Sequence, residues 1–169
     1  AFRQKFHNIV SHEVERIKDL ATQLMDFAKP QQPDLAPTNI HSILNDTVLL
    51  LQNQMSVHHI QLRKEFDPND IVLAVDKNQI KQVFLNIILN AIDAMSDGGT
   101  LTINTKIANG QAVIKMTDTG CGMDPDHLKK LFEPFFTSKT NGTGLGLSIC
   151  DRIIKSHGGK IEVKSVINQ

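Results

Sequence analysis

The sequence lacks the features that several large protein classes need. Its 18 Lys and Arg residues balance 18 Asp and Glu residues, and the pI is about 7.2. A nucleic-acid-binding protein usually carries a basic excess, so no nucleic-acid partner is expected. No apolar run approaches the roughly 18 residues of a membrane-spanning helix, and no signal peptide is recognisable. A cytoplasmic chain is expected, with any membrane segment lying outside these residues.

Cysteine is also scarce. Cys121 and Cys150 have neither metal-binding nor disulfide-like spacing, which fits a reducing compartment. The 169 residues, 40% of them hydrophobic, suffice for one domain of ordinary size plus an appendage. The chain begins with Ala1 rather than Met, so we expect a fragment of a longer protein.

Residues 1–29 are predicted to form one long dimerisation helix. Apolar side chains recur at alternating spacings of four and three, which is typical of a coiled-coil or bundle seam. Such a stripe needs a partner, so a homodimer is inferred; the alternative is a helix lying on the main domain. The seam comprises Phe6, Val10, Ile17, Leu20, Leu24 and Phe27, interrupted by Glu13. Residues 30–38, rich in proline, are predicted to be a linker.

Residues 39–169 alternate helical and strand patterns without a strict strand–helix–strand order. This predicts an α/β domain, a two-layer α/β sandwich with a mixed sheet. Asp76 can cap a helix that continues to Met95, Asn109-Gly110 signals a hairpin, and Asp124-Pro125 can start a short helix. Further helices are expected over 39–56 and up to His157, and strands over 60–66, 71–75, 100–108, 111–117 and 160–166.

Two asparagines stand four residues apart in the segment NIILNA. Asn86 and Asn90 therefore share one face of the predicted helix. Their amide oxygens are hard ligands, and Mg²⁺ uses few protein ligands while it keeps phosphate oxygens and waters. The alternative is an ordinary polar helix face.

Asp118, Gly120 and Gly122 follow a predicted strand directly. Glycines there let a ligand approach the backbone closely. The carboxylate of Asp118 can accept a hydrogen bond from an exocyclic amine such as that of adenine. A simple Asp-Gly turn is the alternative.

A second glycine-rich segment, NGTGLGLSI, leads into a helix. Backbone N–H groups at a helix N-terminus make an anion site. The segment has neither the Gly-Lys-Ser/Thr of a Walker loop nor the last glycine of the dinucleotide fingerprint. A flexible hinge is the alternative. Before it, Phe132, Phe135 and Phe136 can anchor a mobile lid or simply pack in the core.

The order and spacing of these four segments resemble the catalytic, ATP-binding domain of bacterial sensor histidine kinases, a domain of the Bergerat or GHKL type. The resemblance covers residues 35–165. The segment before it resembles the second helix of the dimerisation and phosphoacceptor hairpin, followed by the linker. The family's last strand, after Gly-x-Gly-Thr-x-Phe, is absent, so the domain at 39–169 is expected to be truncated there.

The resemblance implies ATP and Mg²⁺ as cofactors and a role for each matching residue. Asn90 would be the principal Mg²⁺ ligand, supported by Asn86, and both would serve catalysis. Asp118 would bind the adenine amine, while Gly120 and Gly122 shape its pocket; residues 123–143 would be the ATP lid. The phosphate side would comprise Lys139, Gly142, Thr143, Gly144, Leu145 and Gly146, with Lys139 inferred from its charge alone.

The implied activity is transfer of the ATP γ-phosphate to a histidine of the hairpin, for relay to an aspartate of a response regulator. ATP-hydrolysing relatives carry a glutamate where this chain has Asn86, and an amide cannot activate water as a base. Phosphotransfer is therefore favoured over hydrolysis. A GHKL-family ATPase, a serine kinase and a non-catalytic dimerisation module remain the alternatives.

His12 is the one residue that invites assignment as the phosphoacceptor, because Glu13 follows it. The motif His-Glu-x-Arg-x-Pro is nevertheless absent, and Pro30 follows too soon for a turn and a second helix. We therefore expect no phosphoacceptor in this chain and no autophosphorylation by it. The sensed signal and the cognate response regulator are not encoded in these residues.

Overall fold

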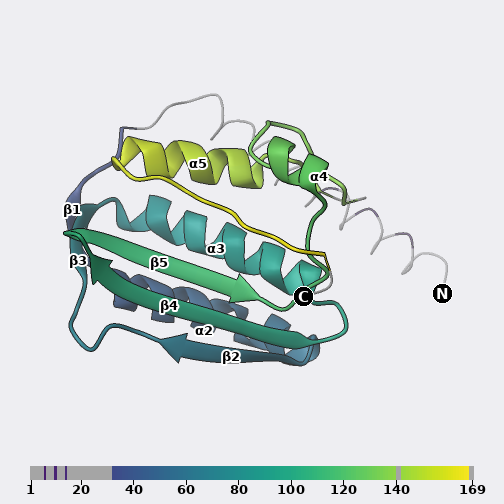
Figure 1. The fold of residues 1–169 in the computed structure, drawn as a ribbon, viewed down its shortest axis with the longest axis horizontal. Helices are drawn as coiled ribbons and strands as arrows, with labels where there is room; N and C mark the ends of the chain where they lie inside the picture. Colours follow the sequence, from purple (N-terminus) through teal and green to yellow (C-terminus); the bar gives the residue numbers. More distant parts are fainter. Residues whose placement is uncertain (1–5, 7–9, 11–13, 15–31, 140–141, 168–169) are drawn as a thin grey trace.

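The computed structural model describes residues 6, 10, 14, 32–139 and 142–167. The chain order is strand, helix, two strands, helix, hairpin and two further helices (Figure 1). The elements are β1 (Ala36–Asn39), α2 (Ile40–Val57), β2 (Ile60–Glu65), β3 (Val72–Val75), α3 (Lys77–Ala94), β4 (Gly99–Ala108), β5 (Gln111–Asp118), α4 (Pro125–Lys130) and α5 (Gly146–Ser156).

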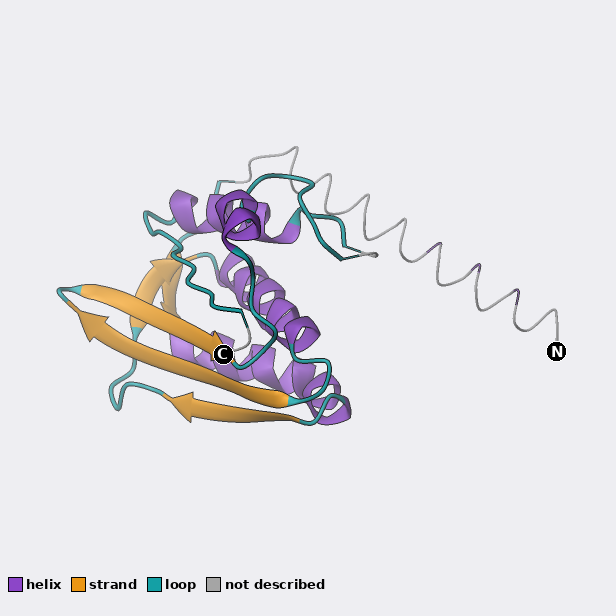
Figure 2. Ribbon diagram, turned by 45° about the vertical axis from the view of Figure 1, so that its right-hand side comes forward, coloured by secondary structure: helices purple, strands orange, loops and turns teal. Residues whose placement is uncertain are grey.

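The larger sheet has the order β2-β4-β5, parallel between β2 and β4 and antiparallel between β4 and β5. β1 and β3 form a separate antiparallel pair. The helices gather on one side of the larger sheet, and α3 packs against both α2 and α5 (Figure 2). The predicted two-layer α/β sandwich with a mixed sheet is confirmed.

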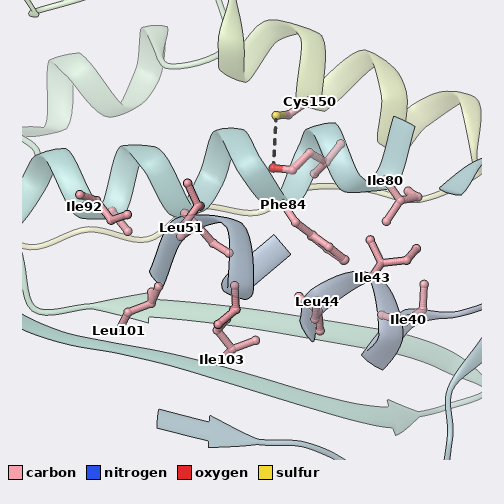
Figure 3. Close-up of a cluster of buried hydrophobic side chains, with 14 of the residues drawn as sticks. Ile40, Ile43, Leu44, Leu51, Ile80, Phe84, Ile92, Leu101, Ile103 and Cys150 are labelled. Carbon is pink, nitrogen blue, oxygen red and sulfur yellow. Dashed lines mark hydrogen bonds between the residues drawn. The ribbon is translucent and has the colours of Figure 1, made fainter. Parts of the chain in front are cut away.

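The hydrophobic core lies between α2, α3 and β4. Ile43, Leu44, Ile88, Leu101 and Ile103 are completely buried. In Figure 3, the labelled side chains of the two helices point toward one another and toward β4, while Cys150 of α5 lies on the opposite side of α3. α3 is thus packed on two sides, against α2 and against α5.

Local signals explain where several elements begin. Asp76 caps α3 by accepting hydrogen bonds from the N–H groups of Asn78 and Gln79, at 2.9 and 3.1 Å. Asn109 and Gly110 both have positive φ, as a tight hairpin turn requires. The predictions of the α3 cap and of the hairpin are confirmed, as is the short helix after Asp124.

One expectation from the sequence is wrong. Residues 160–166, predicted to be a strand, contain none, although the alternating side chains favoured one. The predicted linker at 30–38 contains the start of β1, which pairs Ala36 with Val75. Pro37 argued against a strand, but β1 has only β3 beside it, and an edge strand tolerates proline.

The predicted dimerisation helix lies mostly outside the described residues. Of residues 1–29, the structure describes Phe6, Val10 and Val14, each helical and exposed. His12 and the rest of the seam lie outside that part, so these expectations stay predictions. Among the described residues, no helix is both long and apolar enough to cross a membrane.

Candidate functional site

α3 carries the two asparagines on one face because its opposite face packs into the core. Ile80, Phe84 and Ile88 recur every four residues and are buried, whereas Asn86 and Asn90 are half-buried. The helix runs from its Asp76 cap toward the loop after β5. It therefore presents Asn86 in its middle and Asn90 near its C-terminal end.

Asn86 ties α3 to α5. Its Nδ2 donates to the Gly146 carbonyl oxygen at 3.4 Å and approaches the Cys150 Sγ at 3.6 Å. Burial raises the pKa of the Cys150 thiol to about 11, which keeps it neutral at physiological pH. In Figure 3 this thiol also reaches the Val83 carbonyl oxygen across the α3–α5 contact. Asn86 thus holds the first turn of α5 beside the polar face of α3.

Asn90 contacts a lysine that is distant in sequence. The Lys139 Nζ donates to the Asn90 Oδ1 at 2.7 Å and to the Asp93 Oδ2 at 2.6 Å. Lys139 belongs to the segment between α4 and α5, so this contact brings that segment against the last turns of α3. Two residues predicted for the site, Asn90 and Lys139, therefore meet.

The Asp118 loop, defined as residues 118–123, lies against the C-terminal end of α3. The Cys121 N–H donates to the Ala94 carbonyl oxygen at 3.1 Å. A Cβ on Gly120 would lie 2.7 Å from both the Ala94 Cβ and its carbonyl oxygen. Asp118 itself is exposed, and its Oδ1 accepts a hydrogen bond from the Gly120 N–H at 3.0 Å. The backbone holds this carboxylate in place while leaving it accessible.

The far end of the Asp118 loop is fastened to the C-terminal segment. The Met123 N–H donates to the Ser165 Oγ at 2.8 Å. Gly122 has φ +72°, and a side chain there would collide with the Val166 backbone. Close packing therefore requires glycine at both 120 and 122. The sequence analysis had explained these glycines only by the room that they leave for a ligand.

The glycine segment, defined as residues 142–146, leads into α5. The Phe135 N–H donates to the Gly144 carbonyl oxygen at 3.0 Å, and both residues have positive φ. The N-cap of α5 is Leu145, whose side chain makes no capping bond. Its own N–H is bonded to the Thr143 Oγ1 at 3.3 Å. The N-terminus of α5 therefore begins next to Asn86 without a side-chain cap, which suits an anion site.

The structure brings most of the predicted residues to one end of α3. The Asp118 loop, Asn90 and Lys139 meet at its last turns, and Asn86 joins the glycine segment one turn earlier. Asp93 was missed in the sequence, although its position three residues after Asn90 places it on the same face. Among the described residues, no three His, Cys, Asp or Glu side chains cluster as metal ligands.

Comparison with known proteins identifies the class of this fold and site. The profile of the family described as histidine kinase-, DNA gyrase B- and HSP90-like ATPase matches residues 75–169. This is more than half of the chain, and the chain belongs to that family. Family membership makes this an ATP-binding domain.

Similar proteins are named as sporulation kinases or as histidine kinases. Sporulation kinase C of Bacillus subtilis (strain 168) is 38% identical over 164 residues, covering 96% of this chain and 38% of that protein. The catalytic domain of histidine kinase ThkA is 31% identical with a TM-score of 0.68, covering 73% of this chain and 81% of that one. ThkA in complex with the response regulator TrrA matches with 26% identity and a TM-score of 0.77, covering 93% of this chain and 46% of that one. The chain thus spans about two fifths of the curated relative.

Proposed function

We propose that this chain is the ATP·Mg²⁺-binding kinase domain of a two-component sensor histidine kinase. It transfers the γ-phosphate of ATP to a histidine on a dimerisation hairpin, from which a response regulator aspartate receives it. The observation that carries the proposal is the meeting of Asn90, the Asp118 loop and Lys139 at one end of α3, with Asn86 and the start of α5 alongside.

The adenine would lie against the Asp118 loop. The exposed Asp118 carboxylate can accept a hydrogen bond from the exocyclic amine, which a guanine would not offer at the same ring position. The loop is fixed by its bonds to Ala94 and Ser165, so little order has to be gained on binding.

The triphosphate would lie along the glycine segment. The start of α5, which has no side-chain cap, favours negative charge, whereas the N–H groups of Gly142 and Leu145 already donate to the Lys139 carbonyl oxygen and the Thr143 Oγ1. The contributors there are Gly142, Thr143, Gly144, Leu145 and Gly146, with Lys139 as the nearby cationic side chain.

The donor set fits Mg²⁺ together with phosphates. Asn90 offers a carbonyl oxygen that already accepts a cationic donor, and Asn86 supports it from the same face. Two amides without a carboxylate cluster suit a Mg²⁺ that takes most of its ligands from phosphate and water. When bound, Mg²⁺ supplies charge neutralisation at the phosphates.

Asn86 supports phosphotransfer in preference to hydrolysis. Its amide nitrogen faces the Gly146 carbonyl oxygen, so this position organises α5 and offers no base to water. The protein's part in catalysis is then to position the nucleotide and stabilise its charge, while the nucleophile comes from the hairpin.

The partners follow from the same proposal. Residues 1–29 are proposed to form the dimerisation helix of a homodimer, 30–38 the linker and 39–169 the catalytic domain. The complex of ThkA with TrrA supports a response regulator receiver domain as the downstream partner.

Calorimetric titration with ADP tests the site. Replacing Asp118 by alanine should weaken ADP binding by about 10- to 150-fold, as expected for loss of a hydrogen bond to a charged group. Asp46→Ala is the matched control, because it removes the same side chain from α2, where Asp46 pairs with Lys77 at 3.7 Å. Unchanged ADP affinity in Asp118→Ala would remove Asp118 from the site. Failure of the unmodified chain to bind ADP would favour a non-catalytic dimerisation module.

A further inference from the structure

The ammonium group of Lys139 lies between two oxygens of α3. Its Nζ is 2.7 Å from the Asn90 Oδ1 and 2.6 Å from the Asp93 Oδ2. The Lys139 and Asp93 side chains are 43% and 55% exposed, so the group is reachable from solvent. This contact joins the segment before α5 to the one helix face that carries both predicted metal-binding asparagines.

The helix geometry makes these two oxygens converge. Residues three apart on a helix lie on the same face, and one ammonium contacts both side chains at hydrogen-bonding distance. An amide oxygen and a carboxylate oxygen are also the hard donors that Mg²⁺ and Mn²⁺ prefer. The cationic group found between them is therefore chemically comparable to a divalent cation.

We propose that Asn90 and Asp93 form one cation-binding cradle, in which the Lys139 ammonium and a divalent cation exclude each other. Asp93 thereby becomes a metal-site residue in addition to the two asparagines. Lys139 acts as a tethered competitor that neutralises Asp93 until the divalent cation replaces it. This inference rests on the proposed function for its role with ATP, but the cradle itself is testable without nucleotide.

The charges decide the direction of the exchange. A divalent cation is attracted to the Asp93 carboxylate more strongly than a monovalent ammonium is at the same distance. The displaced ammonium would then be available to the phosphates, which the proposed function puts along the glycine segment. After the exchange, the divalent cation would occupy the cradle and the Lys139 ammonium would be free to contact the triphosphate, so both positive groups would lie near the phosphates.

Mn²⁺ alone is the probe for the cradle. It is added to the ¹⁵N-labelled chain without nucleotide, and paramagnetic broadening of the Asn90 side-chain amide signal is followed. Lys139→Met removes the competitor, so half-maximal broadening should require about two- to fivefold less Mn²⁺, which corresponds to an exposed ion pair. Lys160→Met is the matched control, because it removes the same charge from a pair with Glu162 on the segment after α5.

Asp93→Asn tests the other side of the cradle. It keeps the size of the side chain but removes its charge, so half-maximal broadening should require about fivefold more Mn²⁺. In the Asp93→Asn background, Lys139→Met should have a smaller effect than in the unmodified chain, because the ammonium has already lost its ion pair with Asp93 and keeps only its contact with the Asn90 Oδ1.

The results separate the cradle from the proposed function. Equal Mn²⁺ requirements in the unmodified chain and Lys139→Met, or no change in Asp93→Asn, would overturn the cradle and leave an ordinary surface ion pair. ADP binding measured by calorimetry with Mg²⁺ present, on separate samples of the same variants, reports the nucleotide site. A chain that binds ADP yet shows no Lys139 effect therefore contradicts only the cradle. A chain that shows the effect without binding ADP contradicts only the proposed function.

Discussion

The Asp118 loop and the glycine segment flank the same face of α3 but are held in different ways. The Asp118 loop is bonded through its backbone to Ala94 and to the Ser165 side chain, and two of its glycines are in close contact with other segments. In the glycine segment, the Gly144 carbonyl oxygen accepts from the Phe135 N–H, the Gly146 carbonyl oxygen accepts from the Asn86 Nδ2, and the Leu145 N–H donates to the Thr143 Oγ1. The residues just before the glycine segment contact α3 through the side chain of Lys139, which bonds to Asn90.

This difference separates stability from ligand binding. Changes in the Asp118 loop should affect folding and nucleotide affinity together, because the same backbone contacts serve both. A change at Gly146, at the end of the glycine segment, should affect affinity with little cost in folding, because a Cβ there meets only Asn86 atoms, the nearest at 3.7 Å. Under the proposed function, the fixed Asp118 loop would hold the base, and the end of the glycine segment would contact the phosphates.

The largest expected effect comes from a pair of matched glycine substitutions. Gly120→Ala places a Cβ 2.7 Å from Ala94 atoms and should cost about 1–3 kcal/mol of unfolding free energy. Gly146→Ala meets only Asn86 atoms, the nearest at 3.7 Å, and should leave stability unchanged or raise it by up to about 1 kcal/mol through helix propensity.

Urea unfolding measures the stability of both variants, and ADP titration measures their nucleotide affinity. Gly146→Ala should weaken ADP binding without loss of stability, because its Cβ would stand between the backbone and the phosphates in the proposed site. If both variants lost stability equally, the distinction between the two regions would be wrong.

A smaller perturbation compares the two cysteines. Cys121 in the Asp118 loop is exposed, whereas Cys150 behind the glycine segment is fully buried and its pKa is raised to about 11. The thiolate is the reactive form. Iodoacetamide at neutral pH should therefore modify Cys121 readily and Cys150 only when the chain opens, and ADP should slow the reaction at Cys121. Peptide mass spectrometry distinguishes the two sites, and equal rates would contradict the described packing of α5.

The sequence predicts the features that depend on nearby residues. The Asp76 cap, the Asn109-Gly110 turn and the face shared by Asn86 and Asn90 are each set within a few positions of the chain. β1 was missed because its strand character depends on pairing with residues 72–75, and Pro37 argued against it locally. The segment 160–166 shows the converse case, since alternating side chains do not by themselves supply a hydrogen-bonding partner.

The candidate site follows the same division. The order and spacing of the motifs pointed to Asn90, Asp118 and the glycines as candidates, because an amide, a carboxylate and glycines are residue types suited to binding metal, base and phosphate. The contact of Lys139 with Asp93 joins residues 46 positions apart and depends on how the segment before α5 returns to α3. The role of Asn86 as a tie to Gly146 is likewise visible only once α3 and α5 are packed together.

Incubation with γ-labelled ATP and Mg²⁺ tests the central claim most directly. The chain is assayed alone and with a separately supplied two-helix hairpin that carries a His-Glu-x-Arg-x-Pro segment. Acid-labile phosphate should appear on the hairpin, and the chain alone should neither label His12 nor release phosphate steadily. Acid-stable label would instead indicate a serine kinase. Steady phosphate release by the chain alone would contradict the account and identify an ATP-hydrolysing member of the family.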